Sequence, residues 1–360
     1  MKDERAHLQL FDLIARDWAL ESPATAISFN SADTAVAFDC ADGTIYLAAT
    51  KDRDSSNSRV RRAVDTGRLT IAPRAKPAAP LKPADFTEGR TSKVVAHGAT
   101  GFAFAKATGR INTLSPGGIS VHLAIKAPGP ISLIASHDAI VAYVCGDHVM
   151  LGAETIAILP DISAIAFSPD GLTLAVAHAD GISRWTVAAP QDAPRHTPLQ
   201  GKPTTIIWRD DTAQVALCLQ SGGFCVVDMA TNTATYHGNF PAPVRYVAFA
   251  MHTNTVIASG AFRVAAWSMA DNSDVVSGKA GLVLIDAIAT CPTRNLVAVG
   301  YANGLLSLAE IGHPAEILLR EDTGAGITAM AWSGCGTYLA VAGADGSAAL
   351  IEFPDSMFKS

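Results

Sequence analysis

A repeat of about 41 residues is the feature that most constrains how this chain folds. Short apolar segments recur along it, and five of six end in an aromatic residue: they close at Phe29, Phe167, Trp208, Phe249, Thr290 and Trp332. From Phe167 onward the intervals are 41, 41, 41 and 42 residues. A period sustained in this way is typical of arrays in which each unit is one small sheet or helix pair that stacks on its neighbours.

The sequence within a unit predicts β-strands. Residues 162–187 read "ISAIAF", "SPDG", "LTLAVAHA", "DG" and "ISRWTV", which are alternating or β-branched segments separated by short turns. This order predicts a three-stranded antiparallel meander. A weaker fourth strand is expected before the next unit, in the segments 154–159, 233–238, 273–278 and 315–320. One such sheet cannot cover its own faces, so the copies must pack on one another.

Four units contain nearly the same phrase, in which small apolar residues lead into Asp-Gly or Asn-Gly. The polar residues of these dipeptides are Asp42, Asp180, Asn303 and Asp345. They could form a ring of carboxylates at one end of the assembly. We favour a simpler interpretation, a type I′ hairpin turn, since that turn needs positive φ at both central residues and these dipeptides supply it.

The repeats resemble those of the WD-repeat family of β-propellers, over residues 25–353. The segment Phe167–Gly171 matches the family's "F-S-P-D-G" turn, and Ile182–Trp185 matches its "I-x-x-W" strand, with Trp267 at the equivalent place of another unit. Two family features are missing: Gly-His occurs once, at 312–313 and out of place, and Trp-Asp never occurs. The family's Asp-His-Ser/Thr-Trp hydrogen-bond network should therefore be incomplete, with stability resting on apolar packing between blades.

The resemblance implies an all-β fold, a β-propeller of four-stranded antiparallel blades, which we take as one domain over residues 1–360. Eight candidate blades begin near residues 25, 93, 131, 162, 204, 244, 284 and 327, although seven is the commonest number in the family. The last unit ends at Phe353 without a fourth strand. In the family an N-terminal strand supplies it, which here would lie within residues 7–20. That segment also fits a short amphipathic helix, with Leu8, Phe11, Ile14 and Trp18 on one face.

Residues 51–93 do not follow the repeat and form a basic, Pro-rich insertion between the first and second units. They contain 11 of the 27 basic and 5 of the 33 acidic residues, a net charge of +6, whereas the remainder has 16 basic and 28 acidic residues, a net charge of −12. One interpretation is an arm that binds an acidic partner, through Arg59, Arg61, Arg62, Arg68, Arg74 and Lys76. The other is a solvated insertion with one blade strand, within 67–72, and with its charge against the protein's own acidic surface.

Composition limits the class of protein. The formal charge of −6 argues against a surface that binds nucleic acid throughout. The N-terminal residues do not resemble a secretory signal, and the longest uncharged stretch, 323–344, reads as a Gly-rich hairpin rather than a membrane span. Six scattered cysteines form no C-x-x-C pair. We expect a cytoplasmic protein with reduced thiols and no membrane span.

No motif indicates catalysis, a cofactor or a metal. Histidines lack H-x-x-x-H spacing, and Gly-x-Ser-x-Gly is absent. Ser-x-x-Lys occurs only at 356–359, and Lys106 in the glycine-rich stretch 98–109 does not follow a glycine. If Leu219 pairs with Phe224, Cys218 and Cys225 face each other across a hairpin, where we expect them to be small apolar residues.

The resemblance implies a non-catalytic scaffold for protein–protein interaction, with partner and oligomeric state left open. Arginines such as Arg184, Arg209, Arg245 and Arg263 could contribute to binding patches. The alternatives are a propeller enzyme, a hydrolase or lyase with its site at the channel mouth, or an accessory protein in metal handling. An enzyme or metal site predicts charged or histidine side chains from at least three blades meeting at the channel, whereas a channel of Ala, Val and Ser would contradict it.

Overall fold

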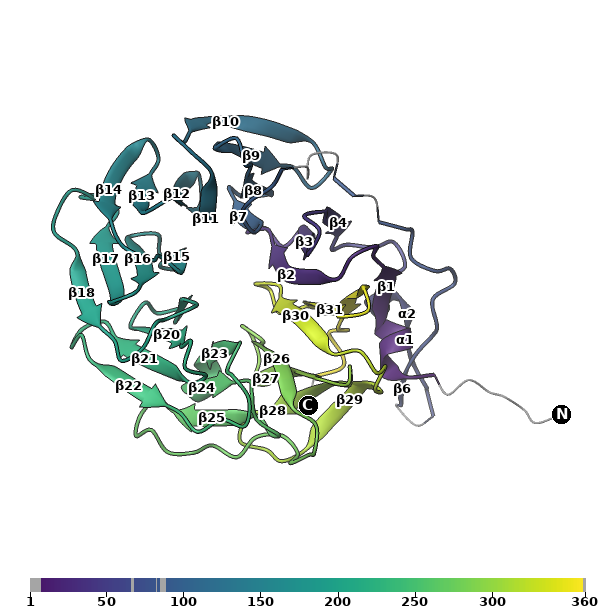
Figure 1. Cartoon of the computed structure of the whole chain (residues 1–360). Coiled ribbons are helices and arrows are strands. Elements are labelled where there is room, and N and C mark those ends of the chain that lie inside the picture. Colours follow the sequence, from purple (N-terminus) through teal and green to yellow (C-terminus); the bar gives the residue numbers. More distant parts are fainter. Residues whose placement is uncertain (1–7, 66–67, 82, 85–88, 359–360) are drawn as a thin grey trace.

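The computed structural model describes residues 8–65, 68–81, 83–84 and 89–358. Small sheets stand around a central opening, each with its first strand innermost (Figure 1). The chain is an all-β propeller of eight blades, as predicted, and the seven-bladed alternative is discarded. Helix is confined to α1 Leu10–Ile14, α2 Ser56–Arg59 and the 3-10 turn η1 Met251–Thr253 among the described residues.

The first four blades follow the chain in order. They contain β2 Ala24–Phe29, β3 Ala35–Cys40 and β4 Ile45–Ala49 (blade 1); β7 Val95–His97, β8 Gly101–Ala105, β9 Arg110–Leu114 and β10 Ser120–Lys126 (blade 2); β11 Ile131–His137, β12 Ile140–Cys145, β13 His148–Leu151 and β14 Glu154–Ile158 (blade 3); and β15 Ala164–Phe167, β16 Thr173–His178, β17 Gly181–Thr186 and β18 Arg195–Pro198 (blade 4).

The last four blades complete the ring. They contain β19 Ile207–Trp208, β20 Gln214–Cys218, β21 Phe224–Asp228 and β22 Ala234–His237 (blade 5); β23 Val247–Ala250, β24 Thr255–Ala258 and β25 Ala265–Ser268 (blade 6); β26 Ile285–Thr290, β27 Leu296–Tyr301, β28 Leu306–Glu310 and β29 Glu316–Arg320 (blade 7); and β30 Ile327–Trp332, β31 Tyr338–Gly343 and β32 Ser347–Glu352 with β1 Ala15–Ala19 (blade 8).

Blades 1 and 6 have only three regular strands. The fourth position of blade 1 holds the bridge between Tyr46 and Pro83, next to a hydrogen bond from the Ala84 amide to the Ile45 carbonyl at 2.8 Å. In blade 6, the strand expected at 273–278 is reduced to two isolated bridges, Val264 with Ser277 and Trp267 with Asp274. The outer edge of these blades is therefore irregular, although the blade count is unchanged.

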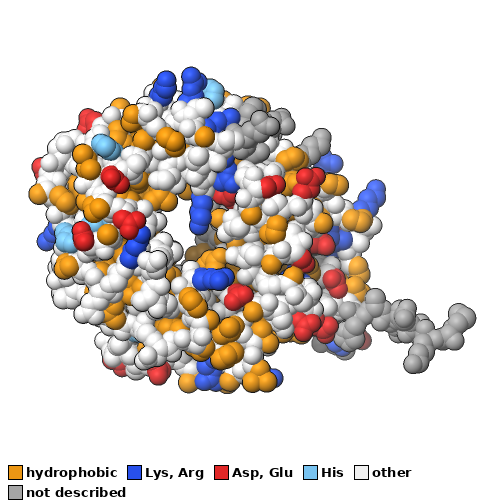
Figure 2. Space-filling model, viewed as in Figure 1, with side chains coloured by type: hydrophobic (Ala, Val, Ile, Leu, Met, Phe, Trp, Pro, Cys, Tyr) orange, Lys and Arg blue, Asp and Glu red, His pale blue; other side chains and the backbone are white. Residues whose placement is uncertain are grey.

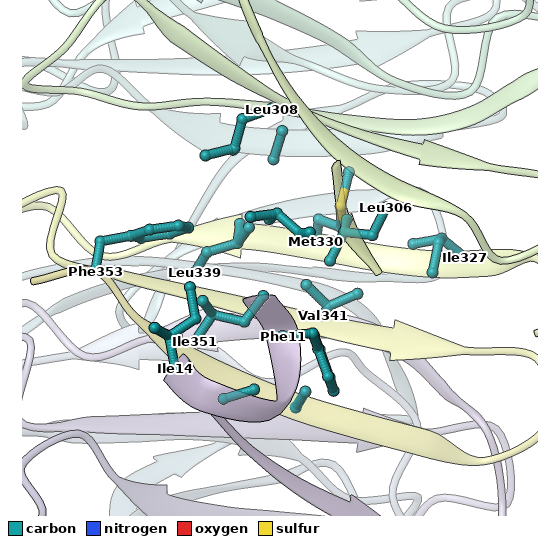
Figure 3. Close-up of a cluster of buried hydrophobic side chains, with 14 of the residues drawn as sticks. Phe11, Ile14, Leu306, Leu308, Ile327, Met330, Leu339, Val341, Ile351 and Phe353 are labelled. Atoms are coloured by element: carbon teal, nitrogen blue, oxygen red, sulfur yellow. The ribbon is translucent and has the colours of Figure 1, made fainter. Parts of the chain in front are cut away.

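The N-terminal segment closes the ring as predicted. Strand β1 pairs antiparallel with β32, from Ala15 opposite Ile351 to Ala19 opposite Ser347. Helix α1 immediately precedes it, so the described residues 8–20 of this segment contain a short helix and then a strand, and Ile14 at the end of the helix is 2% exposed. Figure 3 shows Phe11 and Ile14 beside Leu339, Val341 and Ile351 of blade 8, in a core shared with blade 7.

Apolar cores fill all eight junctions between neighbouring blades, including the junction of blade 8 with blade 1. The second strand of each blade divides its residues between two cores. In β16, Ala175 and Ala177 face blade 5, whereas Leu174 and Val176 face blade 3, and all four are fully buried. The recurrent small residues thus let adjacent blades approach closely.

Blades 4 and 7 contain different polar networks, and neither is the Asp-His-Ser/Thr-Trp network of WD repeats. In blade 4, the Ser183 hydroxyl lies 2.9 Å from Nε2 of His178 and 3.1 Å from Nδ1 of His196. In blade 7, the Tyr301 and Ser307 hydroxyls donate to the Glu316 carboxylate at 3.0 and 2.6 Å. In these two blades the buried polar groups are therefore satisfied by different residue types.

The Asp-Gly and Asn-Gly turns are not type I′, so that prediction was wrong. Only their glycines have positive φ, which is 93° at Gly43, 87° at Gly304 and 84° at Gly346, and none of the four Asp or Asn residues does. Their side-chain oxygens instead accept the backbone N–H two residues on, in the pairs Asp42 with Thr44, Asn303 with Leu305 and Asp345 with Ser347. These three turns are three-residue loops with a left-handed glycine, whereas the turn at Asp180 has two residues between the paired His178 and Gly181.

Two further local predictions were wrong. Cys218 pairs with Phe224 and Cys225 with Leu217, because the Leu219 amide bonds to the Gly223 carbonyl and shortens the loop. The cysteines consequently lie in different cores, on opposite faces of blade 5. The strand expected within 67–72 forms as β6 Leu69–Ile71, but it pairs with β5 Val60–Arg62 and belongs to no blade.

Candidate functional site

The segment between β4 and β7 contains helix α2 followed by the hairpin of β5 and β6. We call residues 60–71 the basic hairpin. Val60 pairs with Ile71 and Arg62 with Leu69. In Figure 1 these elements lie outside the ring of blades, on the side of helix α1 and strand β1. The insertion is therefore attached where the N-terminal segment closes the propeller.

Two of the six residues proposed for partner binding instead hold the insertion in place. The Arg59 side chain is 6% exposed and donates to the Leu13 carbonyl at 2.6 Å and the Ala72 carbonyl at 2.7 Å. It also pairs with Asp54 at 3.3 Å. Arg74 pairs with Asp52 and donates to the Asp54 carbonyl at 3.2 Å. The acids that pair with these arginines lie in the insertion itself, not on the blades.

The other four residues are exposed. Arg61, Arg62 and Arg68 lie on the basic hairpin, and Lys76 follows it. The Arg61 guanidinium donates to nearby backbone carbonyls, those of Ser58 and Val60. Apolar side chains stand among these cations, since Val64 is 104% exposed and Leu69 is 45% exposed. The hairpin thus presents positive charge and apolar surface together.

A buried ion pair fixes the end of the insertion. Arg90 pairs with Asp39 of strand β3, and their side chains are 8% and 4% exposed. Arg90 also donates to the Gly43 carbonyl at 3.0 Å and the Ser92 carbonyl at 2.5 Å, while Asp39 accepts from the Val94 amide at 3.0 Å. This pair was not predicted from the sequence, although an aspartate inside the apolar strand "AVAFDC" indicates that a cation must lie nearby.

Polar residues surround the entrance of the central channel, one from each blade. Four of them, Thr25, Ser132, Asp286 and Thr328, occupy β-bulges at the start of the innermost strands. Each lies between two residues that pair with the second strand of the same blade. A bulge redirects a side chain out of the sheet's alternation. In the other four blades, Ser163 lies one residue before the first pair of the ladder, and Lys93, Thr205 and Arg245 lie two residues before it. We call this set the channel ring: Thr25, Lys93, Ser132, Ser163, Thr205, Arg245, Asp286 and Thr328.

Six residues of the channel ring line one cavity of about 580 Å³, together with Tyr246 and with mostly apolar residues of blades 5, 6 and 8. Three of the six are charged, namely Lys93 of blade 2, Arg245 of blade 6 and Asp286 of blade 7. Figure 2 shows Lys or Arg side chains on the border of the central opening. The channel mouth therefore carries charged side chains on a partly apolar lining, and it is not lined by Ala, Val and Ser alone.

Charged side chains from three blades meet the condition set for an enzyme, but the cavity lining offers one carboxylate and no histidine. Catalysis by a general acid and a general base together needs a second titratable side chain beside that carboxylate. The Tyr246 hydroxyl donates to the Thr328 carbonyl, and burial raises its pKa. Within the described part of the chain, no three His, Cys, Asp or Glu residues are placed to hold a metal ion.

The remaining candidates do not gather into one site. Arg184 is 7% exposed and donates to the Met229 carbonyl, and Arg209 pairs with Asp211 at 3.0 Å. Of the four arginines considered for binding patches, Arg245 is the one that lines the channel cavity. Burial raises the pKa of the Cys218 thiol to about 11 and that of Cys225 to about 12, which keeps both unreactive. No helix in the described ranges is long and apolar enough to span a membrane.

Acidification should destabilise the propeller. Burial lowers the pKa of His97, His178 and His237 in the folded state, and His196 lowers that of His178 further. These imidazoles bind protons more readily in the unfolded chain. Their contribution to the free energy of unfolding is therefore complete above the unfolded pKa of about 6.5 and is lost as the pH falls below it. We expect a lower Tm at acidic than at neutral pH. His237→Phe, which keeps a ring against Phe224, should reduce the change in Tm between neutral and acidic pH. An unchanged pH dependence of Tm would contradict the explanation.

Comparisons with known proteins agree with this architecture. The chain folds like the computationally designed Ika8 protein, with a TM-score of 0.66 and 18% identity over 96% of this chain and 100% of that chain. It also folds like the C-terminal WD40 domain of Sif2, with a TM-score of 0.62 and 14% identity over 96% of this chain and 99% of that chain. A search of curated protein sequences found no match.

The closed ring of blades defines the class of this protein as a β-propeller. Residues 317–351 match the family model described as "WD domain, G-beta repeat", and they include strands β30 and β31. The chain therefore has the fold of a β-propeller, and one of its repeats is similar to the WD repeat.

Proposed function

We propose that this protein is a non-catalytic scaffold for protein–protein interaction, and that the basic hairpin contacts an acidic surface of a protein partner. The observation that carries the proposal is the exposure of Arg61 and Arg62 beside Val64 and Leu69, on a hairpin that Arg59 ties to the ring. Apolar contact supplies affinity, while cations steer an acidic partner and set the orientation.

A protein partner suits this surface better than nucleic acid. The remainder of the chain carries a net charge of −12, which repels a polyphosphate backbone, whereas the exposed Val64 side chain needs an apolar contact. All six cysteines are unpaired, which fits the reducing cytoplasm where we place the protein. The enzyme and metal-handling alternatives are not favoured, because the channel offers one carboxylate and no metal-ligand cluster was found in the described residues.

A shortened hairpin tests the proposal. Replacing residues 61–70 with Asn-Gly keeps the Val60–Ile71 pair, as well as Arg59 and Arg74, and joins the strands by a two-residue turn. Affinity purification from native lysate, read by quantitative mass spectrometry, should lose a partner that the full chain retains at low salt. Arg110→Gln/Arg195→Gln, which removes two exposed arginines away from the hairpin, is the matched control and should retain it. An unchanged set of proteins with the shortened hairpin would contradict the proposal.

A further inference from the structure

We propose that the channel ring binds a small multivalent anion, with phosphate or carboxylate groups held by Lys93 and Arg245. This site is separate from the basic hairpin, so it does not depend on the scaffold function. Blades 2 and 6 stand opposite each other in a ring of eight, and both cations line the same cavity. A ligand that contacts both must carry negative charge at two ends.

Hydrogen bonds hold several residues of the channel ring in place without a ligand. The Thr328 hydroxyl donates to the Ala24 carbonyl of the next blade at 2.6 Å, and the Ser163 hydroxyl donates to the Pro203 carbonyl at 2.6 Å. The Thr205 hydroxyl accepts from the Cys218 amide at 3.1 Å. These bonds join strands and blades at the rim. A preorganised site binds with a smaller loss of conformational entropy than a loop that must become ordered.

The backbone on both sides of Lys93 is fixed by the buried ion pair. The Arg90 guanidinium donates to the Ser92 carbonyl and the Asp39 carboxylate accepts from the Val94 amide, so both neighbours of Lys93 are held. On the opposite side, the backbone amide of Arg245 donates to the Ser259 hydroxyl at 3.2 Å. Both cations therefore extend from positioned backbone.

The two cationic groups are available for a ligand. The Lys93 ammonium and the Arg245 guanidinium make no hydrogen bond or ion pair with another described residue, and Asp286 lines the same cavity without pairing to either. Such cations bind anions through charge-assisted hydrogen bonds, with arginine able to use two donors at once. A volume of about 580 Å³ is in the range of small-molecule sites.

Isothermal titration calorimetry of the full chain at low ionic strength tests the site, with tripolyphosphate and citrate as probes. At least one of them should bind, and the tighter one identifies phosphate or carboxylate as the preferred group. Lys93→Gln/Arg245→Gln should weaken binding by about 100-fold, since each charge-assisted hydrogen bond accounts for roughly tenfold or more. Arg61→Gln/Arg62→Gln removes the same charge outside the cavity and should leave the affinity within about twofold.

Asp286→Asn provides a second readout that keeps both cations. Removing the carboxylate should tighten binding several-fold, because it leaves the cavity more positive. Thermal unfolding of each variant verifies that it remains folded. Absence of binding by both probes at millimolar concentration, or an equal loss of affinity in the hairpin control, would overturn the proposal, and so would weaker binding by Asp286→Asn.

Discussion

Truncating the chain to begin at Leu20 should abolish the cooperative unfolding transition of the propeller or lower its Tm drastically. The truncation removes β1, which supplies the fourth strand of blade 8, and α1, whose Phe11 and Ile14 are 7% and 2% exposed. It would expose the edge of β32 and open the core between blades 7 and 8. Thermal and urea unfolding, followed by circular dichroism, measure the effect.

Point variants distinguish the loss of ring closure by the N-terminal segment from a general effect of shortening the chain. Phe11→Ala should cost about 3–5 kcal/mol and Ile14→Ala about 2–5 kcal/mol of unfolding free energy, because each leaves a cavity in that core. Leu8→Ala is the control, since Leu8 is 57% exposed and should change stability by less than about 0.5 kcal/mol. Equal, small effects for all three would show that the N-terminal segment does not close the ring.

The second large effect is expected at the ion pair between blade 1 and the insertion. Arg90→Ala should reduce the unfolding free energy by about 3–5 kcal/mol, because it leaves the Asp39 carboxylate buried without a cation. The Gly43 and Ser92 carbonyls lose their donor as well. Urea unfolding measures the change.

A double-mutant cycle provides the control for Arg90. Asp39→Ala alone should destabilise strongly because it leaves the guanidinium buried, whereas Asp39→Ala/Arg90→Ala should be less destabilised than the two single losses added together. Strict additivity would mean that the two side chains do not stabilise each other. The same cycle shows whether the insertion is fixed at its C-terminal end, which affects how the neighbouring Lys93 is presented.

Periodic features of the fold could be predicted from the sequence. The regular intervals between aromatic residues predicted the blades, because each copy must bury the same faces. The missing fourth strand after Phe353 predicted closure by residues 7–20, and β1 confirms it. In both cases the pattern extends over many residues, so a local irregularity does not obscure it.

Features decided by one or two residues could not be predicted in the same way. The Cys218–Cys225 register depended on a loop that is shorter by one residue than expected, and such a shift moves a side chain to the other face of the strand. The channel ring was not recognised, because β-bulges at Thr25 and Asp286 are visible only in the pairing of strands. Arg59 was assigned to partner binding, since net charge does not reveal which cation is buried.

The scaffold function is tested most directly by photo-crosslinking from the basic hairpin in living cells. A photoreactive amino acid placed at Val64, which is 104% exposed, should form a covalent adduct with a discrete protein partner. The adduct should be lost when Arg61 and Arg62 are changed to glutamate, and it should be absent when the probe is placed at Ile158, which is 65% exposed on the edge of blade 3. An adduct pattern identical at the two positions, or no protein adduct from Val64, would contradict the account.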